Sequence, residues 1–374
     1  MAGRVAPYVD NTGLVFAYDL ANIARSYLGE PTVNLLYSAG AYNLIDGATD
    51  IYGRVTKTNL GGGKYRFVNN GTGVSTIRLY TNQSDLINGA TYGCSVYFEN
   101  LVGSLAIDWC DTSITGVNSS TSPSGRLYGT GTRALYDGPY YFLDVDLSTG
   151  GAVTLYDPQV EYKSHVTPFV AGTRSATQGL KDLTGNSTID LSNVSFDSNA
   201  QMTFDGTDDY VRITRPVEDD FTLEVIFKTS TAAPTGTQWY QGVGLMDSEI
   251  GGYQNDFGLA YLNNKAVFGI GSTDTTIQST STINDGSYYH IVATRIRSTG
   301  AIAVYVNGIL EATGTGNTNS LTSQTYMWIG SSNGGVGSNG APNGDIPIAK
   351  AYNRALTADE IRTNYVHYKG RYQI

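Results

Sequence analysis

The feature that most constrains this chain is a two-residue alternation of apolar and polar side chains. Residues 221–228 read FTLEVIFK, so the apolar side chains at the odd positions share one face of an extended strand, and Thr222, Glu224 and Lys228 lie on the other. Successive side chains of a strand point to opposite faces of a sheet. The pattern therefore predicts a half-buried strand of an antiparallel sheet.

Further strands of this kind follow toward the C-terminus, at residues 288–297, 301–306 and 326–329. The pair Asn307-Gly308 comes directly after the second of them. Both central residues of a tight hairpin turn need a positive φ, which Asn and Gly adopt readily. Because clusters of Gly, Asn, Ser and Asp recur about every 8–12 residues, the sequence predicts an antiparallel β-sandwich.

Helices have little support in the composition, since 45 of the 374 residues are glycine and only 15% are charged. A complete helix signal is present at the C-terminus. Thr357 is a suitable N-cap, and Glu360, three residues later, completes a capping box. Ile361, Tyr365 and Tyr368 then share one helical face. We expect one short helix that closes an all-β domain.

The charge balance excludes two classes of partner. The chain has 33 acidic and 23 basic residues and a net charge of −10. It therefore lacks the basic surface that nucleic-acid binding needs, and anionic membranes would repel it. It also has no apolar stretch of about 18 residues. We expect neither a nucleic-acid partner nor membrane insertion.

The middle of the chain, residues 31–172, differs in its residue pattern from the C-terminal part and is predicted to form a second β-sandwich. Strand-like runs occur within it at residues 91–98 and 104–110. Cys94 and Cys110 fall in these two runs, which would be neighbours in a hairpin. Two buried thiols are the favoured interpretation in a reducing cytosol, and a disulfide is the alternative.

Three aspartates, Asp205, Asp208 and Asp209, cluster in one predicted loop. Calcium takes six or more oxygen ligands, so a calcium site is one interpretation. The alternative is that Asp and Gly build the turn between two strands, because short polar side chains bond their own backbone. We favour the turn.

Aromatic side chains are abundant, with 28 tyrosines in the chain. Trp239 and Tyr240 follow a Pro- and Gly-containing segment that reads as a loop, and Tyr253 lies in the next one. Exposed flat rings stack on the C–H faces of sugars, and interfaces between subunits are also enriched in Tyr and Trp. These three residues are the candidates for a glycan or partner contact.

The C-terminal half resembles the laminin-G-like group of the concanavalin A-like lectin/glucanase superfamily. The order and spacing of the matching segments carry the resemblance, namely MTFDGTDDYV at 202–211, FTLE at 221–224, YHIVA at 289–293, VYVNG at 304–308, MWIG at 327–330 and AYNRALT at 351–357. The resemblance implies two antiparallel sheets packed as a jelly roll, with calcium on rim loops in several members.

The resemblance also implies a discontinuous domain. GLVFAYD at 13–19 is similar to the first strand of this family, and GLKDLTGN at 179–186 is similar to the segment that normally follows it. Residues 1–30 and 173–374 are therefore expected to form one jelly roll. Residues 31–172 would be an inserted sandwich, similar to the carbohydrate-binding modules of phage proteins, which an exposed loop accommodates readily.

No catalytic residue is predicted. Related glucanases carry an E-x-D-x-x-E motif whose carboxylates point into one cleft, and this motif is absent, with Glu224 alone in its strand. His290 matches a histidine that recurs in the corresponding strand of the family, and the resemblance implies a structural role for it. The motif G-x-S-x-G at 330–334 lacks the following helix that a nucleophile elbow requires.

The whole pattern is similar to virion proteins of tailed phages, particularly cyanophages. The resemblance implies a non-enzymatic structural protein of the capsid surface or a fibre, assembled in the host cytoplasm. Its partners would be other virion subunits, further copies of itself and, with weak affinity, host-surface glycans. A free lectin and a glycoside hydrolase of the same fold are the alternatives.

Overall fold

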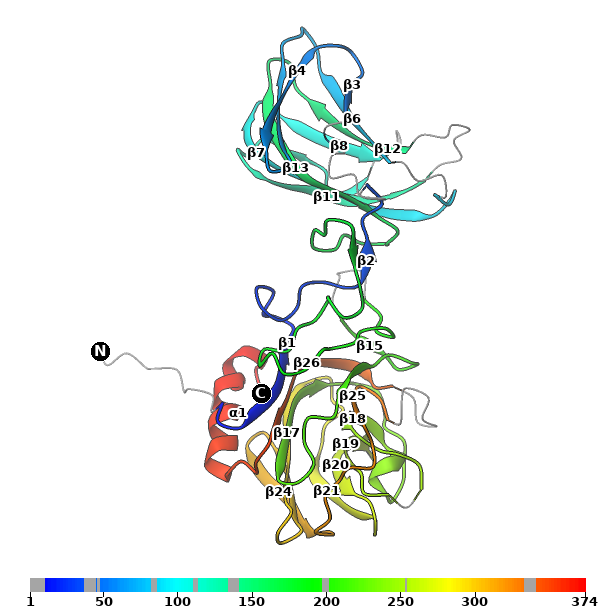
Figure 1. The fold of residues 1–374 in the computed structure, drawn as a ribbon, viewed down its shortest axis with the longest axis vertical. Helices are drawn as coiled ribbons and strands as arrows, with labels where there is room; N and C mark the ends of the chain where they lie inside the picture. Colours follow the sequence, from blue (N-terminus) through cyan, green and yellow to red (C-terminus); the bar gives the residue numbers. More distant parts are fainter. Residues whose placement is uncertain are drawn as a thin grey trace, which may run out of the picture. The chain divides into compact units, whose positions relative to one another are not determined.

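The computed structural model describes residues 11–36, 45, 48–81, 86–109, 114–133, 141–196, 202–252, 254–332 and 341–374. The chain divides into two compact units (Figure 1). Unit 1 consists of Met1–Glu30, Ala176–Asp197 and Gln201–Ile374, and unit 2 consists mainly of Pro31–Ser175. The second boundary lies three residues beyond the expected end of the insertion at residue 172.

The first sheet of unit 1 has seven antiparallel strands. In spatial order, six of them are β1 (Leu14–Asp19), β26 (Asn343–Tyr352), β17 (Phe221–Lys228), β22 (Tyr288–Ile296), β23 (Ala301–Val306) and β24 (Ile309–Thr315), and β15 (Phe204–Asp205) pairs with β26. The turn between β23 and β24 is the predicted one, since φ is 50° at Asn307 and 74° at Gly308.

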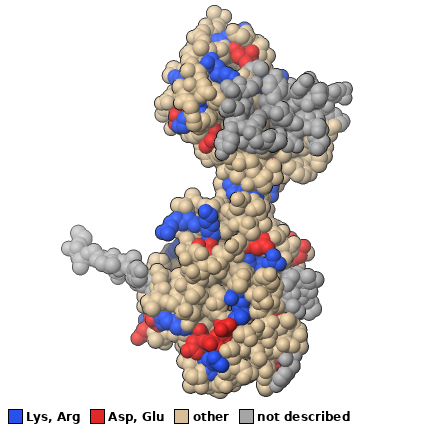
Figure 2. Space-filling view, viewed as in Figure 1, with Lys and Arg blue, Asp and Glu red and all other residues tan. Residues whose placement is uncertain are grey.

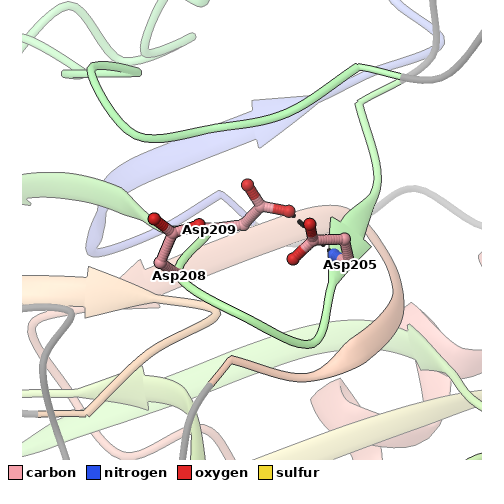
Figure 3. Close-up of side chains that lie close together, drawn as sticks. All are labelled: Asp205, Asp208 and Asp209. Carbon is pink, nitrogen blue, oxygen red and sulfur yellow. Dashed lines mark hydrogen bonds between the residues drawn. The ribbon is translucent and has the colours of Figure 1, made fainter.

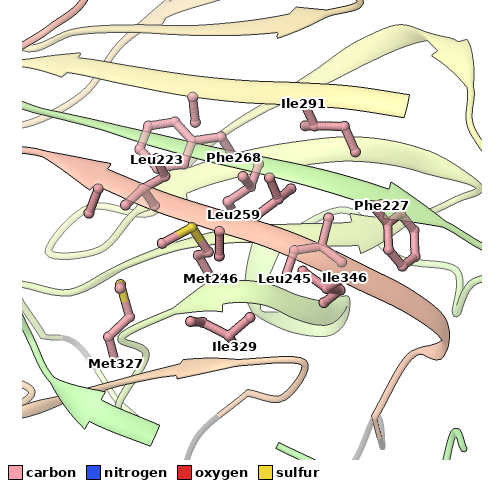
Figure 4. Close-up of a cluster of buried hydrophobic side chains, with 14 of the residues drawn as sticks. Leu223, Phe227, Leu245, Met246, Leu259, Phe268, Ile291, Met327, Ile329 and Ile346 are labelled. Carbon is pink, nitrogen blue, oxygen red and sulfur yellow. The ribbon is translucent and has the colours of Figure 1, made fainter. Parts of the chain in front are cut away.

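The second sheet of unit 1 has six antiparallel strands. In spatial order these are β16 (Val211–Thr214), β25 (Tyr326–Ile329), β18 (Val243–Asp247), β19 (Phe257–Leu262), β20 (Lys265–Ile270) and β21 (Thr275–Thr282). Apolar side chains from both sheets meet in one core, including Leu223 and Phe227 of the first sheet and Leu245, Leu259 and Phe268 of the second (Figure 4).

The prediction that β17 is buried on one face only is wrong. Its polar face is also buried, with Thr222 and Glu224 fully inaccessible to solvent. The C-terminal helix α1 (Ala358–Tyr372) packs over this face through Ile361 and Tyr368 (Figure 1). The predicted capping box at its first turn, between Thr357 and Glu360, is confirmed.

Unit 2 has a five-stranded sheet, a six-stranded sheet and a short two-stranded ribbon. The five-stranded sheet, in spatial order, is β10 (Ser119–Ser120), β8 (Leu105–Trp109), β12 (Tyr141–Leu147), β6 (Ser75–Thr81) and β3 (Thr49–Asp50). The six-stranded sheet is β4 (Val55–Gly61), β5 (Lys64–Asn69), β13 (Ala152–Glu161), β7 (Thr91–Val102), β11 (Gly125–Thr132) and β9 (Thr115–Val117). The ribbon joins β2 (Thr32–Val33) to β14 (Thr173–Arg174).

The two sheets of unit 2 enclose a core of their own, which contains Trp109, Phe98 and Cys94. Cys110 lies outside the described residues. The prediction of an almost entirely β protein with antiparallel sheets and one short C-terminal helix is therefore confirmed. Within the described ranges, no helix combines the length and the apolar character needed to span a membrane.

Candidate functional site

Asp205 ends β15, and Asp208 and Asp209 lie on the loop between β15 and β16 (Figure 3). Asp209 is 1% exposed, and its two carboxylate oxygens accept hydrogen bonds from the backbone N–H groups of Asp205, at 2.7 Å, and Ser195, at 2.8 Å. The Asp205 carboxylate accepts one from the N–H of Thr207 at 2.8 Å. Burial raises the pKa of Asp209, against the lowering effect of these hydrogen bonds.

The hydrogen bonds account for this cluster as turn chemistry. One oxygen from each aspartate lies within 4.8 Å of the others, a spacing that a cation could use. However, both oxygens of Asp209 are already committed to backbone donors, and Asp205 and Asp208 are exposed. The geometry therefore favours the turn interpretation for Asp205, Asp208 and Asp209.

Replacement of the buried member tests this interpretation. Asp209→Ala should lower the free energy of unfolding by about 2 kcal/mol, because two backbone N–H groups in partly buried hydrogen bonds lose a charged acceptor. Asp208→Ala, in the same loop but exposed, should change it by less than about 0.5 kcal/mol. Urea unfolding measures both. A large rise in the melting temperature of the unaltered protein in millimolar calcium would contradict the turn interpretation.

The prediction that Trp239 is exposed is wrong. Trp239 lies in a short 3₁₀ helix, η2 (Trp239–Gln241), and is 1% exposed. Its ring packs with Leu262 and Val267 over Gly258 and Gly269 of β19 and β20. A Cβ atom on Gly269 would stand 2.0 Å from the indole ring, so a glycine is required there.

The other two aromatic candidates are Tyr240 and Tyr253. Tyr240 is 37% exposed and contacts the edge of Trp239, with ring centroids 5.8 Å apart. Tyr253 lies outside the described residues. The structure therefore does not bring the three together as an exposed surface. The glycines at outward positions of β19 and β20 are the sequence signal that could have located Trp239 over the sheet.

His290 has a carboxylate partner, and both lie in the interior. Its Nε2 atom is 2.7 Å from Oε1 of Glu224, and both side chains are fully buried. The second carboxylate oxygen accepts hydrogen bonds from the Tyr352 hydroxyl and the Asn364 amide, each at 3.1 Å. Burial raises the pKa of Glu224, but the charge of Lys350 and the His290 contact outweigh burial and lower the pKa to about 2. This network joins α1 to the first sheet.

Two further buried acids, Asp247 and Asp256, hold the segment between β18 and β19. Asp247 accepts a hydrogen bond from the N–H of Glu249 at 2.7 Å, and Asp256 accepts one from the N–H of Ile250 at 3.0 Å. Burial raises the pKa of Asp247 well above its usual value and that of Asp256 to about 7.

A pocket of about 750 Å³, lined mainly by polar and charged residues, lies at one end of unit 1, and we call it the loop pocket. Its walls come from the β16–β17 loop, the β22–β23 turn, the segment after β24 and the residue after β26. The lining residues are Arg215, Pro216, Val217, Glu218, Asp219, Asp220, Arg297, Ser298, Thr318 and Asn353. On the face shown in Figure 2, acidic and basic side chains are interspersed among uncharged ones.

The buried side chain of Arg295 stabilises two of the loops that line the loop pocket. It is fully buried, and its guanidinium donates hydrogen bonds to the carbonyls of Glu218 at 3.2 Å and Asp219 at 2.7 Å. It also donates to the carbonyls of Asn317 at 3.2 Å and Asn319 at 2.6 Å, on either side of the Thr318 wall. One buried side chain therefore fixes two loops that are distant in sequence.

Ion pairs order the charged side chains of the loop pocket. Arg297 lies 3.1 Å from the Asp219 carboxylate, and Arg215 lies 3.4 Å from the Glu218 carboxylate. A hydrogen bond from Ser320 contributes most to lowering the pKa of Asp219. No sequence motif indicated these residues, although the run of charges at 215–220 is unusual in a chain that is only 15% charged.

Comparison with known proteins gives one family match. Residues 205–362 match the family described as the concanavalin A-like lectin/glucanases superfamily. The matched range contains every strand of the second sheet and most strands of the first. No curated protein sequence matches the chain.

Several solved structures are similar to parts of the chain. The receptor-binding domain of botulinum neurotoxin type G is 16% identical with a TM-score of 0.36, and the match covers 51% of this chain and 49% of that one. The CBM40 of a Ruminococcus gnavus sialidase is 14% identical with a TM-score of 0.33, covering 39% and 83%. Domain 4 of the Geobacillus stearothermophilus arabinanase AbnA, in complex with arabinotriose, is 16% identical with a TM-score of 0.38, covering 51% and 93%.

The chain covers about half the length of the first of these structures and of the binding domain of paraclostridial mosquitocidal protein 1. The similarity of the chain to these solved structures is low. The comparison with the lectin/glucanase family therefore rests on the family match and on the two packed antiparallel sheets. Residues 205–362 of this chain are therefore similar to the concanavalin A-like lectin/glucanase domains of the laminin-G-like type.

Proposed function

We propose that this protein binds glycans without cleaving them, through the loop pocket of unit 1, as a component of a tailed-phage virion surface. The loop pocket carries the proposal. It places carboxylates, guanidiniums, an amide and two hydroxyls around a volume of about 750 Å³. Sugar hydroxyls donate and accept hydrogen bonds, so they need both kinds of partner, and binding sites supply them from a rigid frame.

Binding rather than hydrolysis is supported by the state of the carboxylates. A glycosidase needs a carboxylic acid with a raised pKa beside a second carboxylate. In the loop pocket, Asp219 and Glu218 are each paired with an arginine, and the pKa of Asp219 is lowered. The Asp219 carboxylate is therefore suited to accepting hydrogen bonds as an anion. Release of reducing ends from a bound oligosaccharide would overturn the non-enzymatic part of the proposal.

The virion part of the proposal rests on the sequence resemblance. Many copies on one particle would convert weak pockets into useful avidity. Fractionation of particles from cells that produce the protein tests this part. Co-purification with virions supports it, and recovery of the protein only in the particle-free fraction favours the free lectin instead.

A glycan array with the purified chain tests the binding part. We expect bound neutral oligosaccharides, with the affinity reduced about fivefold in Asn353→Ala, because a lost hydrogen bond contributes about 1 kcal/mol. Asp208→Ala, exposed and outside the pocket, is the matched control and should bind normally. Binding that is equal in the unaltered chain and in Asn353→Ala would exclude the loop pocket as the site.

A further inference from the structure

One carboxylate that lines the loop pocket has no ion-pair partner. Five of the lining residues carry charge. Arg297 pairs with Asp219 and Arg215 pairs with Glu218. Asp220 is left without an ion pair; the buried Arg295 attracts it electrostatically, but the Nη1 and Nη2 atoms of Arg295 already donate to backbone carbonyls.

Both arginines are also held by backbone carbonyls. Arg215 donates from Nε to the carbonyl of Gln324 at 2.7 Å and from Nη1 to that of Val217 at 2.5 Å. Arg297 donates from Nε to the carbonyl of Thr318 at 3.0 Å. A ligand carboxylate would have to compete with the existing acceptors for these donors, so the arginines are poorly placed to attract an acidic sugar.

Asp220 is positioned for recognition of a ligand. It is exposed and comes directly before β17, and its Oδ1 atom accepts a hydrogen bond from the backbone N–H of Arg297 at 2.7 Å. This bond fixes the carboxylate at the pocket wall. Within the part of the chain that the structure describes, Oδ2 of Asp220 has no hydrogen-bond partner, so it remains available to a ligand hydroxyl or ammonium group.

We infer that the loop pocket selects sugars that carry no acidic group, and that it binds amino sugars at least as well as neutral ones. This inference rests on the proposed function and names its ligand class. Asp220 accepts hydrogen bonds from uncharged hydroxyls and attracts an ammonium group. A uronic or sialic acid would bring a second carboxylate beside it, and like charges in a partly desolvated site repel.

Sugars that share a ring and differ in one group test the inference. The probes are methyl glycosides of glucose and galactose, their 2-amino-2-deoxy forms and their uronic acids, measured by saturation-transfer NMR and competition at low ionic strength. We expect the uronic acids to bind at least about tenfold more weakly than the neutral sugars. Where an amino sugar binds more tightly than its neutral counterpart, we expect the difference in affinity to disappear at high salt.

Two variants of Asp220 sharpen the test. Asp220→Asn keeps the shape of the side chain and should reduce the discrimination against uronic acids, and Asp220→Lys should reverse it. Asp208→Asn is the matched control, and thermal melting confirms that all variants are folded. Uronic acids that bind as tightly as neutral sugars overturn this inference and leave the proposed function standing. Absence of binding by every probe and by the array glycans overturns both.

Discussion

Glu224→Ala should lower the free energy of unfolding by about 3–5 kcal/mol, the range measured when one partner of a buried ion pair is removed. The carboxylate is fully buried, contacts His290 at 2.7 Å and accepts hydrogen bonds from Tyr352 and Asn364. Lys350, only 8% exposed, depends on the same charge. The truncation would leave a buried cation and three buried polar groups without their acceptor.

The pH dependence of stability provides an independent check on this network. Lys350 and the hydrogen bonds lower the pKa of Glu224 from 4.5 to about 2 in the folded protein. Its stabilising contribution is therefore complete above pH 4.5 and disappears as the pH falls toward 2, a change of about 3 kcal/mol. Urea unfolding should show the unaltered protein losing its advantage over Glu224→Ala across this interval.

Glu224→Gln separates the charge from the shape. It keeps an acceptor of the same size but leaves Lys350 uncompensated, so its stability should lie between those of the unaltered protein and Glu224→Ala. A loss below about 1 kcal/mol in Glu224→Ala at neutral pH would show that α1 is held by its apolar contacts, through Ile361 and Tyr368, and that the network is dispensable.

Trp239→Ala is the second large effect that we expect, with a loss of about 3–5 kcal/mol, because it removes a fully packed aromatic side chain and leaves a cavity. The ring fills the space over Gly258 and Gly269, where a Cβ atom on either glycine would clash with it. Chemical unfolding measures the loss. Glycan binding at the loop pocket should be unchanged at temperatures where the variant is folded.

Tyr240 is the matched control for Trp239, since it is the next residue in η2 but is 37% exposed. Tyr240→Ala should change stability by less than about 1 kcal/mol. Trp239→Phe should retain much of the stability, because the indole Nε1 has no hydrogen-bond partner among the described residues. If Trp239→Ala abolished glycan binding and left stability unchanged, Trp239 would be a contact residue and the packing argument would be wrong.

Local patterns were reliable wherever neighbouring residues alone decide the conformation. The strand at 301–306 was predicted with the bounds that β23 has, and the Asn307-Gly308 turn has the expected positive φ values. The Thr357 capping box was predicted for the same reason. Alternation, turns and caps depend on residues close in sequence, so a single sequence is enough to locate them.

Burial of polar side chains was not predictable in this way. Glu224 alternates with apolar residues as a solvent-facing side chain would, yet α1 covers it. Asn364 is buried on the helix face where Tyr365, only partly buried, was expected to pack. Periodicity shows which side chains share a face, but the element that packs on that face is about 140 residues away along the chain.

By itself, the sequence determined the all-β class, the Asn307-Gly308 hairpin turn and the C-terminal helix, because these follow from backbone geometry over a few residues. Only the tertiary structure decided that Trp239 packs over two glycines. It also decided that Arg295 donates hydrogen bonds to two loops that are distant in sequence and that together line a pocket. Sites of this kind depend on which distant segments pair, and the loop-closure entropy and packing that select those pairs leave no periodic trace in the chain.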